Sequence, residues 1–306
     1  MRTARTPIGA VVGSYLAMVA VVSAQDVEPR RWTPLPVGTN VLSAALAHTD
    51  GKIYADPVLR ITDAKVESRT FLLSYLYAFD LLGQSARVDV HLPQRETRWR
   101  GQLDGEWRSV GRSGPGDPRV RLSVNLLGGP ALGGTAFRAY TAAHPVNTVV
   151  GAALAVTLPV GEYLKDKLLN LGENRFVIRP ELGIVHTRGP WSWELTGSAY
   201  LFTDNDAFRG DHQRTQDPLY ALQTHLVRTF TPGWWISLSA DYADGGESRV
   251  DGIRKHDRRG DLLYGVSLGL PINRHSSVKI AYVGSRTQEV IGADTENLAI
   301  SFSFRF

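Results

Sequence analysis

The sequence predicts an all-β fold, a transmembrane antiparallel β-barrel of about 12 strands with short periplasmic turns and long extracellular loops. Three observations lead to this prediction. Apolar and polar residues alternate in stretches of about ten residues. The connections between the stretches alternate between short and long. The chain ends in an alternating stretch whose last residue is Phe306.

Composition excludes several classes of protein. The 306 residues are 43% hydrophobic and 21% charged, as in ordinary folded chains. The chain has no cysteine, so it has no disulfides, no Cys-ligated metal or iron–sulfur site and no thiol nucleophile. The net charge is +4, and without Arg2 and Arg5 of the predicted signal peptide it is about +2 (32 basic minus 30 acidic residues), which is too small to indicate binding to nucleic acid. A mean hydropathy of -0.15, without a long apolar run beyond the N-terminus, argues against a helical membrane protein.

The first 24 residues are predicted to be a cleaved signal peptide. Two arginines precede an apolar stretch from Ile8 to Val22, which ends in the small residues Ser23 and Ala24. A retained helical anchor is the weaker interpretation, because glycine and serine interrupt the stretch and it is short for a membrane span. The predicted organisation is a signal peptide over 1–24, a periplasmic N-terminal segment over 25–38 and a barrel domain over 39–306.

Twelve alternating stretches follow, each bounded by residues that favour turns. They are Thr39–His48, Glu67–Phe79, Ala86–Leu92, Arg119–Leu127, Thr148–Leu158, Arg175–Thr187, Trp191–Phe202, Leu219–Phe230, Trp234–Ala243, Asp261–Leu270, Val278–Arg286 and Asn297–Phe306.

The lengths of the connections favour an outer-membrane barrel, in which short turns lie on one side and long loops on the other. The short connections are 80–85, 188–190, 231–233 and 271–277, and the long charged ones are 49–66, 93–118, 159–174, 203–218, 244–260 and 287–296. The exception is the segment 128–147, which is long yet falls on the short-turn side. Within it, the stretch 131–144 is expected to form a small periplasmic helix or to reach into the lumen.

The last stretch indicates which face meets lipid. Its alternate positions are all apolar, from Leu298 to Phe306, whereas the positions between them are mostly polar or small. A soluble β-sandwich also alternates, but a terminal strand that closes on phenylalanine is typical of outer-membrane barrels. Aromatic residues also gather at strand ends, as two lipid-headgroup girdles would require. They are Phe176, Tyr220, Tyr242 and Tyr264 near the long loops, and Phe79, Trp191, Phe230, Trp234 and Phe306 near the short turns.

The opposite face predicts a polar lumen weighted towards arginine. The predicted lumen-lining residues are Arg87, Asp89, His91, Arg119, Arg121, Arg175, Arg179, Glu181, Glu194, Gln223, His225, Asp241 and Lys279. These charges either pair across the lumen and fill it, or line a wet path, and twelve strands leave room for a narrow pore. On the second interpretation the arginines form a basic wall that attracts anions. Gly151, Ala153 and Ala155 would then leave space for a solute beside that wall.

One predicted loop invites a catalytic or metal-binding interpretation. Asp204, Asp206, Asp211, His212 and Asp217 crowd together, and an Asp–His pair can activate water. The run 204–206 also resembles part of a calcium loop, but it lacks the usual glycine and distal glutamate. Aspartate is common in extracellular loops, so we expect no catalytic residue, no metal site and no cofactor.

Several short motifs resemble the outer-membrane family named for the meta-pathway of phenol degradation, over roughly residues 35–306. The motifs are Pro159–Tyr163, Asn170–Arg175, Phe202–Asp206, Gln216–Gln223 and Asp257–Arg259. The resemblance implies an outer-membrane β-barrel that transports small, often aromatic or hydrophobic, compounds. It implies no catalytic residue. The motifs lie at strand ends and long loops, where either a pore mouth or a structural corner explains them.

We therefore expect a passive channel for small organic solutes in the bacterial outer membrane, not an enzyme. Its expected partners are outer-membrane lipid, small organic solutes and the barrel-assembly machinery, which would read the strand ending in Phe306; nucleic acid is not expected. Two alternatives stay open. One is an outer-membrane protease or lipid hydrolase that uses the loop carboxylates and His212, and the other is a structural barrel with a plugged lumen.

The mature protein is expected to begin at Gln25, because Val22 and Ala24 are the well-placed pair for signal peptidase after the apolar core. Mass analysis of the protein extracted from outer membranes checks this. Retention of Met1 in that fraction would contradict it.

Overall fold

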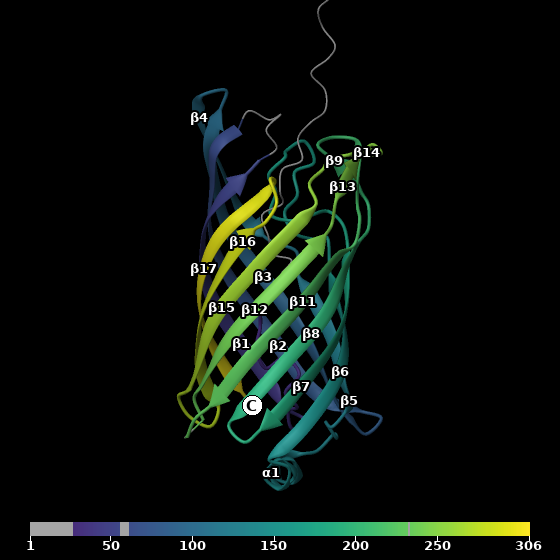
Figure 1. Ribbon diagram of the computed structural model, residues 1–306, viewed down its shortest axis with the longest axis vertical. Coiled ribbons are helices and arrows are strands. Elements are labelled where there is room, and N and C mark those ends of the chain that lie inside the picture. Colours follow the sequence, from purple (N-terminus) through teal and green to yellow (C-terminus); the bar gives the residue numbers. More distant parts are fainter. Residues whose placement is uncertain (1–26, 56–60, 232) are drawn as a thin grey trace, which may run out of the picture.

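The computed structural model describes residues 27–55, 61–231 and 233–306. Within these residues the main sheet closes into an antiparallel barrel of twelve strands (Figure 1). The barrel strands are β1 (Asn40–Tyr54), β2 (Ile61–Leu81), β3 (Gln84–Leu103), β5 (Arg119–Leu127), β6 (Val146–Thr157), β7 (Val177–Arg188), β8 (Trp191–Phe202), β11 (Leu219–Thr229), β12 (Trp235–Gly245), β15 (Arg259–Pro271), β16 (Ser276–Thr287) and β17 (Gly292–Arg305). Each pairs with the next in this order, and β17 pairs back with β1. The predicted fold is confirmed, and the predicted signal peptide lies outside the described residues.

Six further elements decorate the two ends of the barrel. They are β4 (Glu106–Pro115), α1 (Gly134–Ala143), β9 (Asn205–Phe208), β10 (His212–Gln216), β13 (Ser248–Val250) and β14 (Ile253–Arg254). Strands β9, β10, β13 and β14 form a small second sheet beside the ends of the long strands (Figure 1). The predicted loops 203–218 and 244–260 therefore contain short strands.

Three strands extend well beyond the predicted stretches. The predicted loops 49–66 and 93–118 are largely strand, because β1 runs on to Tyr54, β2 starts at Ile61 and β3 continues to Leu103. Strand β4 pairs with this upper half of β3, and β5 pairs with its lower half. Above the bilayer the outward side chains of these strands meet water, so they are polar or charged instead of apolar. The apolar alternation therefore fades although the strands continue.

A small apolar cluster packs on the inner side of this extension. Ile53, Val66 and Trp99, from β1, β2 and β3, are buried against Leu171 of the loop after β6. The extension is thus a folded structure that the loop between β6 and β7 helps to cover.

The long segment 128–147 contains a helix. This agrees with one of the two expectations for the stretch 131–144, a small periplasmic helix. Helix α1 projects below the barrel, at the end of the molecule where the C-terminus lies (Figure 1). None of the helix residues is buried. Just before the helix, the carbonyl of Leu132 accepts a hydrogen bond from the Val37 amide, which ties the segment to the N-terminal residues.

The outer face of the barrel carries large exposed apolar side chains. Leu46, Leu182 and Leu238 are 61%, 66% and 58% exposed and lie on three well-separated strands. In a sandwich such residues would pack against a second sheet, but here the sheet closes on itself and leaves them outward. The surface therefore suits lipid, and the alternative of a soluble β-sandwich is wrong.

No helix among the described residues is long and apolar enough to cross a membrane.

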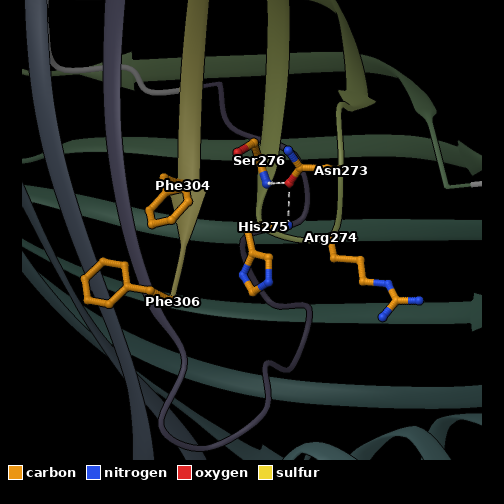
Figure 2. Close-up of a pocket in the computed structure, with 6 residues that line it drawn as sticks. All are labelled: Asn273, Arg274, His275, Ser276, Phe304 and Phe306. Atoms are coloured by element: carbon orange, nitrogen blue, oxygen red, sulfur yellow. Dashed lines mark hydrogen bonds between the residues drawn. The ribbon is translucent and has the colours of Figure 1, made fainter.

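The barrel closes where the first and last strands meet. The Phe306 amide donates to the Asn40 carbonyl over 3.0 Å, and the Asn40 amide donates back over 3.2 Å. The neighbouring turn is fixed by the side chain of Asn273, whose Oδ1 accepts from the amides of His275 and Ser276 (Figure 2). Phe306 itself is 62% exposed, so it contributes little to packing within the barrel.

Replacing Phe306 by aspartate should lower the amount of assembled barrel severalfold without lowering synthesis, because the last strand must be recognised and must then close the sheet. Heat-modifiable mobility on a gel reports assembly. Leu82→Asp is the matched control, since Leu82 is 96% exposed in a turn at the same end and pairs with no strand. Equal amounts of folded protein from both variants would contradict the prediction.

Candidate functional site

The N-terminal segment lies inside the barrel. We expected residues 25–38 in the periplasm, but the residues of this segment that the structure describes turn into the lumen before β1 begins. Both oxygens of Glu194, on the inner face of β8, accept hydrogen bonds from the Arg30 amide at 3.0 and 2.9 Å. Glu28 reaches the other side, where its carboxylate lies 3.5 Å from Lys279 Nζ of β16. The segment therefore crosses the lumen.

Trp32 anchors this segment. Its indole lies on two facing glycines, Gly151 of β6 and Gly183 of β7, which are directly paired. A Cβ atom at Gly151 would come within 2.4 Å of the ring, and one at Gly183 within 2.0 Å. The ring nitrogen donates to Thr196 Oγ1 over 2.7 Å, and the residue is only 1% exposed. The two glycines thus form a seat that no larger residue could form.

An ion network surrounds Glu181 next to this seat. Its carboxylate contacts three guanidinium groups, those of Arg31 at 3.2 Å, Arg121 at 3.2 Å and Arg179 at 2.6 Å. Arg121 also reaches Asp89 at 3.5 Å. Arg31 comes from the N-terminal segment, so the segment supplies charge as well as volume to the filled half of the lumen.

Twelve of the thirteen predicted lumen residues occupy inward positions on the barrel strands, whereas Arg175 lies in the loop just before β7, and the thirteen differ in access. Nine are buried: Asp89, Arg121, Arg175, Arg179, Glu181, Glu194, Gln223, His225 and Asp241. Four are half-buried: Arg87, His91, Arg119 and Lys279. The space beside the predicted basic wall holds Trp32, which lies on Gly151. Most of these residues therefore pack the lumen, and a role for any of them in conduction stays a prediction.

The opposite wall of the barrel is accessible. Four consecutive inward positions on each of β1, β2, β16 and β17 are all half-buried. They are Ser43, Ala45, Ala47 and Thr49; Ser68, Thr70, Leu72 and Ser74; Ser277, Lys279, Ala281 and Val283; and Asn297, Ala299, Ser301 and Ser303. By contrast, the inward alanines of β6, Ala153 and Ala155, are 8% and 1% exposed. The free space in the lumen therefore lies along the first and last strands, and we call these sixteen positions the small-residue wall.

Sequence reasoning missed this wall. Our candidates were polar and charged residues, whereas the wall consists of alanine, serine and threonine with few larger side chains. A signal was present in the last stretch, where Ala299, Ser301 and Ser303 alternate with large apolar residues. Small side chains suggest no particular chemistry, so this alternation alone does not indicate a functional site.

At the extracellular end, one carboxylate holds the loop between β6 and β7. Asp117 Oδ1 accepts from the Gly161 amide at 2.8 Å, and Oδ2 accepts from the Glu173 amide at 2.7 Å. Burial raises the pKa of Asp117, while these two amides oppose that shift. Added Cβ atoms at Gly161 and Gly172 would come within 2.6 and 2.8 Å of the Gly116–Asp117 segment. The glycines therefore permit the close contact.

The motifs that carry the family resemblance meet at this end. Arg175 donates to Glu173 and, over 2.6 Å, to Gln216 Oε1. Asn205 donates to the hydroxyl of Tyr163 and to the carbonyl of Glu173, both over 3.0 Å. Because these residues come from separate motifs and bond to one another, they form a structural corner that fixes the loop across the mouth.

The crowded acidic loop shows no catalytic arrangement. His212 Nδ1 lies 2.5 Å from Asp251 Oδ2, a pairing with another loop rather than with Asp211, and both side chains are about half exposed. The hydrogen bond from His212 lowers the pKa of Asp251. Asp204 and Asp206 both accept from the Gln213 side-chain amide. Across the described residues there is no group of three or more histidine or acidic side chains placed to hold a metal ion. These groups brace the small outer sheet.

A family model described as "Putative MetA-pathway of phenol degradation" matches residues 53–292 of the chain. The match covers more than half of the sequence. The chain belongs to this family. The resemblance drawn from the motifs is thereby confirmed, and the barrel is an outer-membrane protein. A search of curated proteins finds no match.

Solved structures support the fold. An outer membrane channel from Pseudomonas putida F1 superposes with a TM-score of 0.73 at 22% identity, over 92% of this chain and 100% of that chain. The transport unit of the autotransporter AIDA-I from Escherichia coli gives 0.51 at 9% identity, over 92% and 93% of the two chains. The translocator domain of the autotransporter NalP from Neisseria meningitidis gives 0.50 at 8% identity, over 90% and 91%. At such identities the likeness concerns the fold alone.

Gly183→Val should expel Trp32 from its seat, because the added side chain would overlap the indole. The freed segment should then be cut by trypsin after Arg30 and Arg31 at least about tenfold faster, since cleavage follows local opening. Gly197→Val is the matched control: it lies on the adjacent strand, where an added Cβ meets nothing within 4 Å. Equal protection of the segment in both variants would contradict this account of the seat.

Proposed function

We propose that this barrel is a passive outer-membrane channel for small, uncharged organic solutes. The observation that carries the proposal is the small-residue wall, which lies opposite the packed half of the lumen. Only Lys279 is charged among its sixteen residues. A solute that follows this wall meets methyl groups and hydroxyls rather than guanidinium groups.

The chemistry of the wall favours neutral molecules with some apolar surface. Ala47, Ala299 and Ala281 lie side by side on β1, β17 and β16, and Thr70 of β2 is paired with Ala47. Alanine side chains leave width and offer apolar contact, while the surrounding hydroxyls replace some of the hydrogen bonds that a solute loses with water. An ion gains little from such a wall and would lose its hydration.

The family description supports an aromatic solute. Phenol is named in it, and a phenol with a pKa of about 10 is uncharged at neutral pH. A molecule of this kind combines one hydroxyl with an apolar ring, which matches a wall of alanines and hydroxyls. The proposal thus differs from the anion-attracting basic wall that the sequence indicated.

The wall also favours transport over enzymatic chemistry. The acidic loop that suggested a hydrolase is occupied by contacts that hold the outer sheet, and His212 is paired with Asp251. We propose that the protein is not an enzyme.

Replacing Ala47, Ala281 and Ala299 together by leucine should narrow the path and slow the passage of a small uncharged solute at least about fivefold. Swelling of protein-loaded liposomes in erythritol measures this rate. A salt of an organic acid of similar size should pass more slowly through the wild-type protein.

The matched control replaces three outward alanines, Ala44, Ala152 and Ala240, by leucine, which adds the same volume on the lipid face. This variant should swell at the wild-type rate. Unchanged swelling in the inward variant, or faster passage of the acid than of erythritol in the wild type, would count against the proposal.

A further inference from the structure

A groove runs across the outer face of the barrel at the upper edge of the apolar band. It has a volume of about 800 Å³ and crosses β16, β17, β1, β2 and β3. Its apolar part is lined by Leu46, Phe71, Ile280, Leu298 and Ile300, and its polar part includes His48, Arg69, Gln94 and Glu96. The strand pairing is continuous behind it, from β16 through β17 and β1 to β2, so the groove belongs to the surface and not to a hole in the wall.

A row of cations lies directly above this groove on the same outward face. Lys52 of β1 is paired with Lys65 of β2, and Lys65 is paired with Arg100 of β3. Arg98 lies one outward position below Arg100, and Arg69 lies in the groove itself. Like charges directly opposite one another on a sheet oppose pairing, and a bound anion would reduce this repulsion.

Acids stand opposite three of these cations in the strand register, Asp294 opposite Lys52, Glu96 opposite Arg69 and Glu67 opposite Arg98, but none of these three pairs forms an ion pair. Asp50 pairs with His48 at 2.7 Å, and Glu67 reaches Arg100 at 3.6 Å. Lys52, Lys65, Arg69 and Arg98 have exposed side chains and form no ion pair with any described residue. Two arginines elsewhere at this end differ, since Arg258, in the loop before β15, pairs with Asp244, and Arg286 of β16 pairs with Glu296. Four cations without an ion pair to any described residue thus lie together in and above the groove.

We propose that this face binds a phosphate-bearing glycolipid of the outer leaflet. An acyl chain would lie along the apolar part of the groove, and the phosphate groups would meet Arg69, Lys65, Lys52 and Arg98. Charge complementarity supports the occupant, because phosphate oxygens accept hydrogen bonds from both ammonium and guanidinium groups.

The height of the cations favours a glycolipid over a simple phospholipid. Arg69 lies two residues above Phe71, which at ~3.3 Å per residue and a tilt of ~40° places it about 5 Å above the apolar band. Lys52 lies six residues above Leu46, or about 15 Å higher by the same geometry. A headgroup of only about 5–7 Å would not span this range, whereas a phosphorylated sugar headgroup would.

The experiment titrates the purified full-length barrel in detergent with lipid A that carries both phosphates, and counts bound lipid by native mass spectrometry. The variant Lys52→Gln/Lys65→Gln/Arg98→Gln should bind at least about tenfold more weakly, because each cation near such a surface contributes attraction. Ile300→Trp, which fills the groove without changing charge, should also lower binding. Heat-modifiable mobility confirms that each variant is assembled.

The matched control removes three exposed cations elsewhere, with Lys165→Gln/Arg188→Gln/Arg274→Gln, and should bind like the wild type. Dephosphorylated lipid A should bind the wild type as weakly as phosphorylated lipid A binds the first variant. Equal losses in the control, equal binding of the dephosphorylated lipid, or displacement of the lipid by inorganic phosphate at equal concentration would each overturn the proposal.

Discussion

The interior of this barrel depends on the contact between the Trp32 indole and the glycines at 151 and 183. A tryptophan buried to 1% exposure removes about 200 Å² from water, which is worth about 5 kcal/mol. That contact holds a strand-free segment in the lumen and thereby delivers Arg31 to Glu181 and the Arg30 amide to Glu194. Without the segment, Glu194 would lose its two backbone hydrogen bonds, and the Glu181 network would lose one of its cations.

The interior therefore divides into two halves that differ in charge and in burial. On one side buried charges satisfy each other and the N-terminal segment, and removing one partner there would leave a costly uncompensated charge. On the other side the wall is small, mostly neutral and open to solvent. Twelve strands enclose more space than side chains alone would fill, and the proposed passage lies on the side of the small-residue wall.

Sequence patterns were sufficient for the lipid-facing surface and insufficient for the interior and the extracellular end. Outward residues must be apolar within the bilayer, so alternation placed all twelve strands, including β5 and β8 with their full extent. Above the bilayer that requirement ends, and the strands around Tyr54, Ile61 and Leu103 continued without a visible pattern. The burial of Trp32 could not be predicted, because the two glycines that it contacts lie more than a hundred residues away in the sequence. Glycine has no side chain and therefore adds nothing to the apolar and polar alternation from which the strands were predicted.

The order in which the chain is made sets a constraint on how the filled lumen arises. Trp32 bonds to Thr196, a separation of 164 residues, and Ser43 bonds to Ser303 across the closing strands, a separation of 260. Contacts so distant in sequence form slowly. Because the segment leads directly into β1, we expect it to be enclosed in the lumen when the last strand, β17, pairs with β1. We therefore expect the rate of barrel assembly to depend on this segment, although it forms none of the twelve barrel strands.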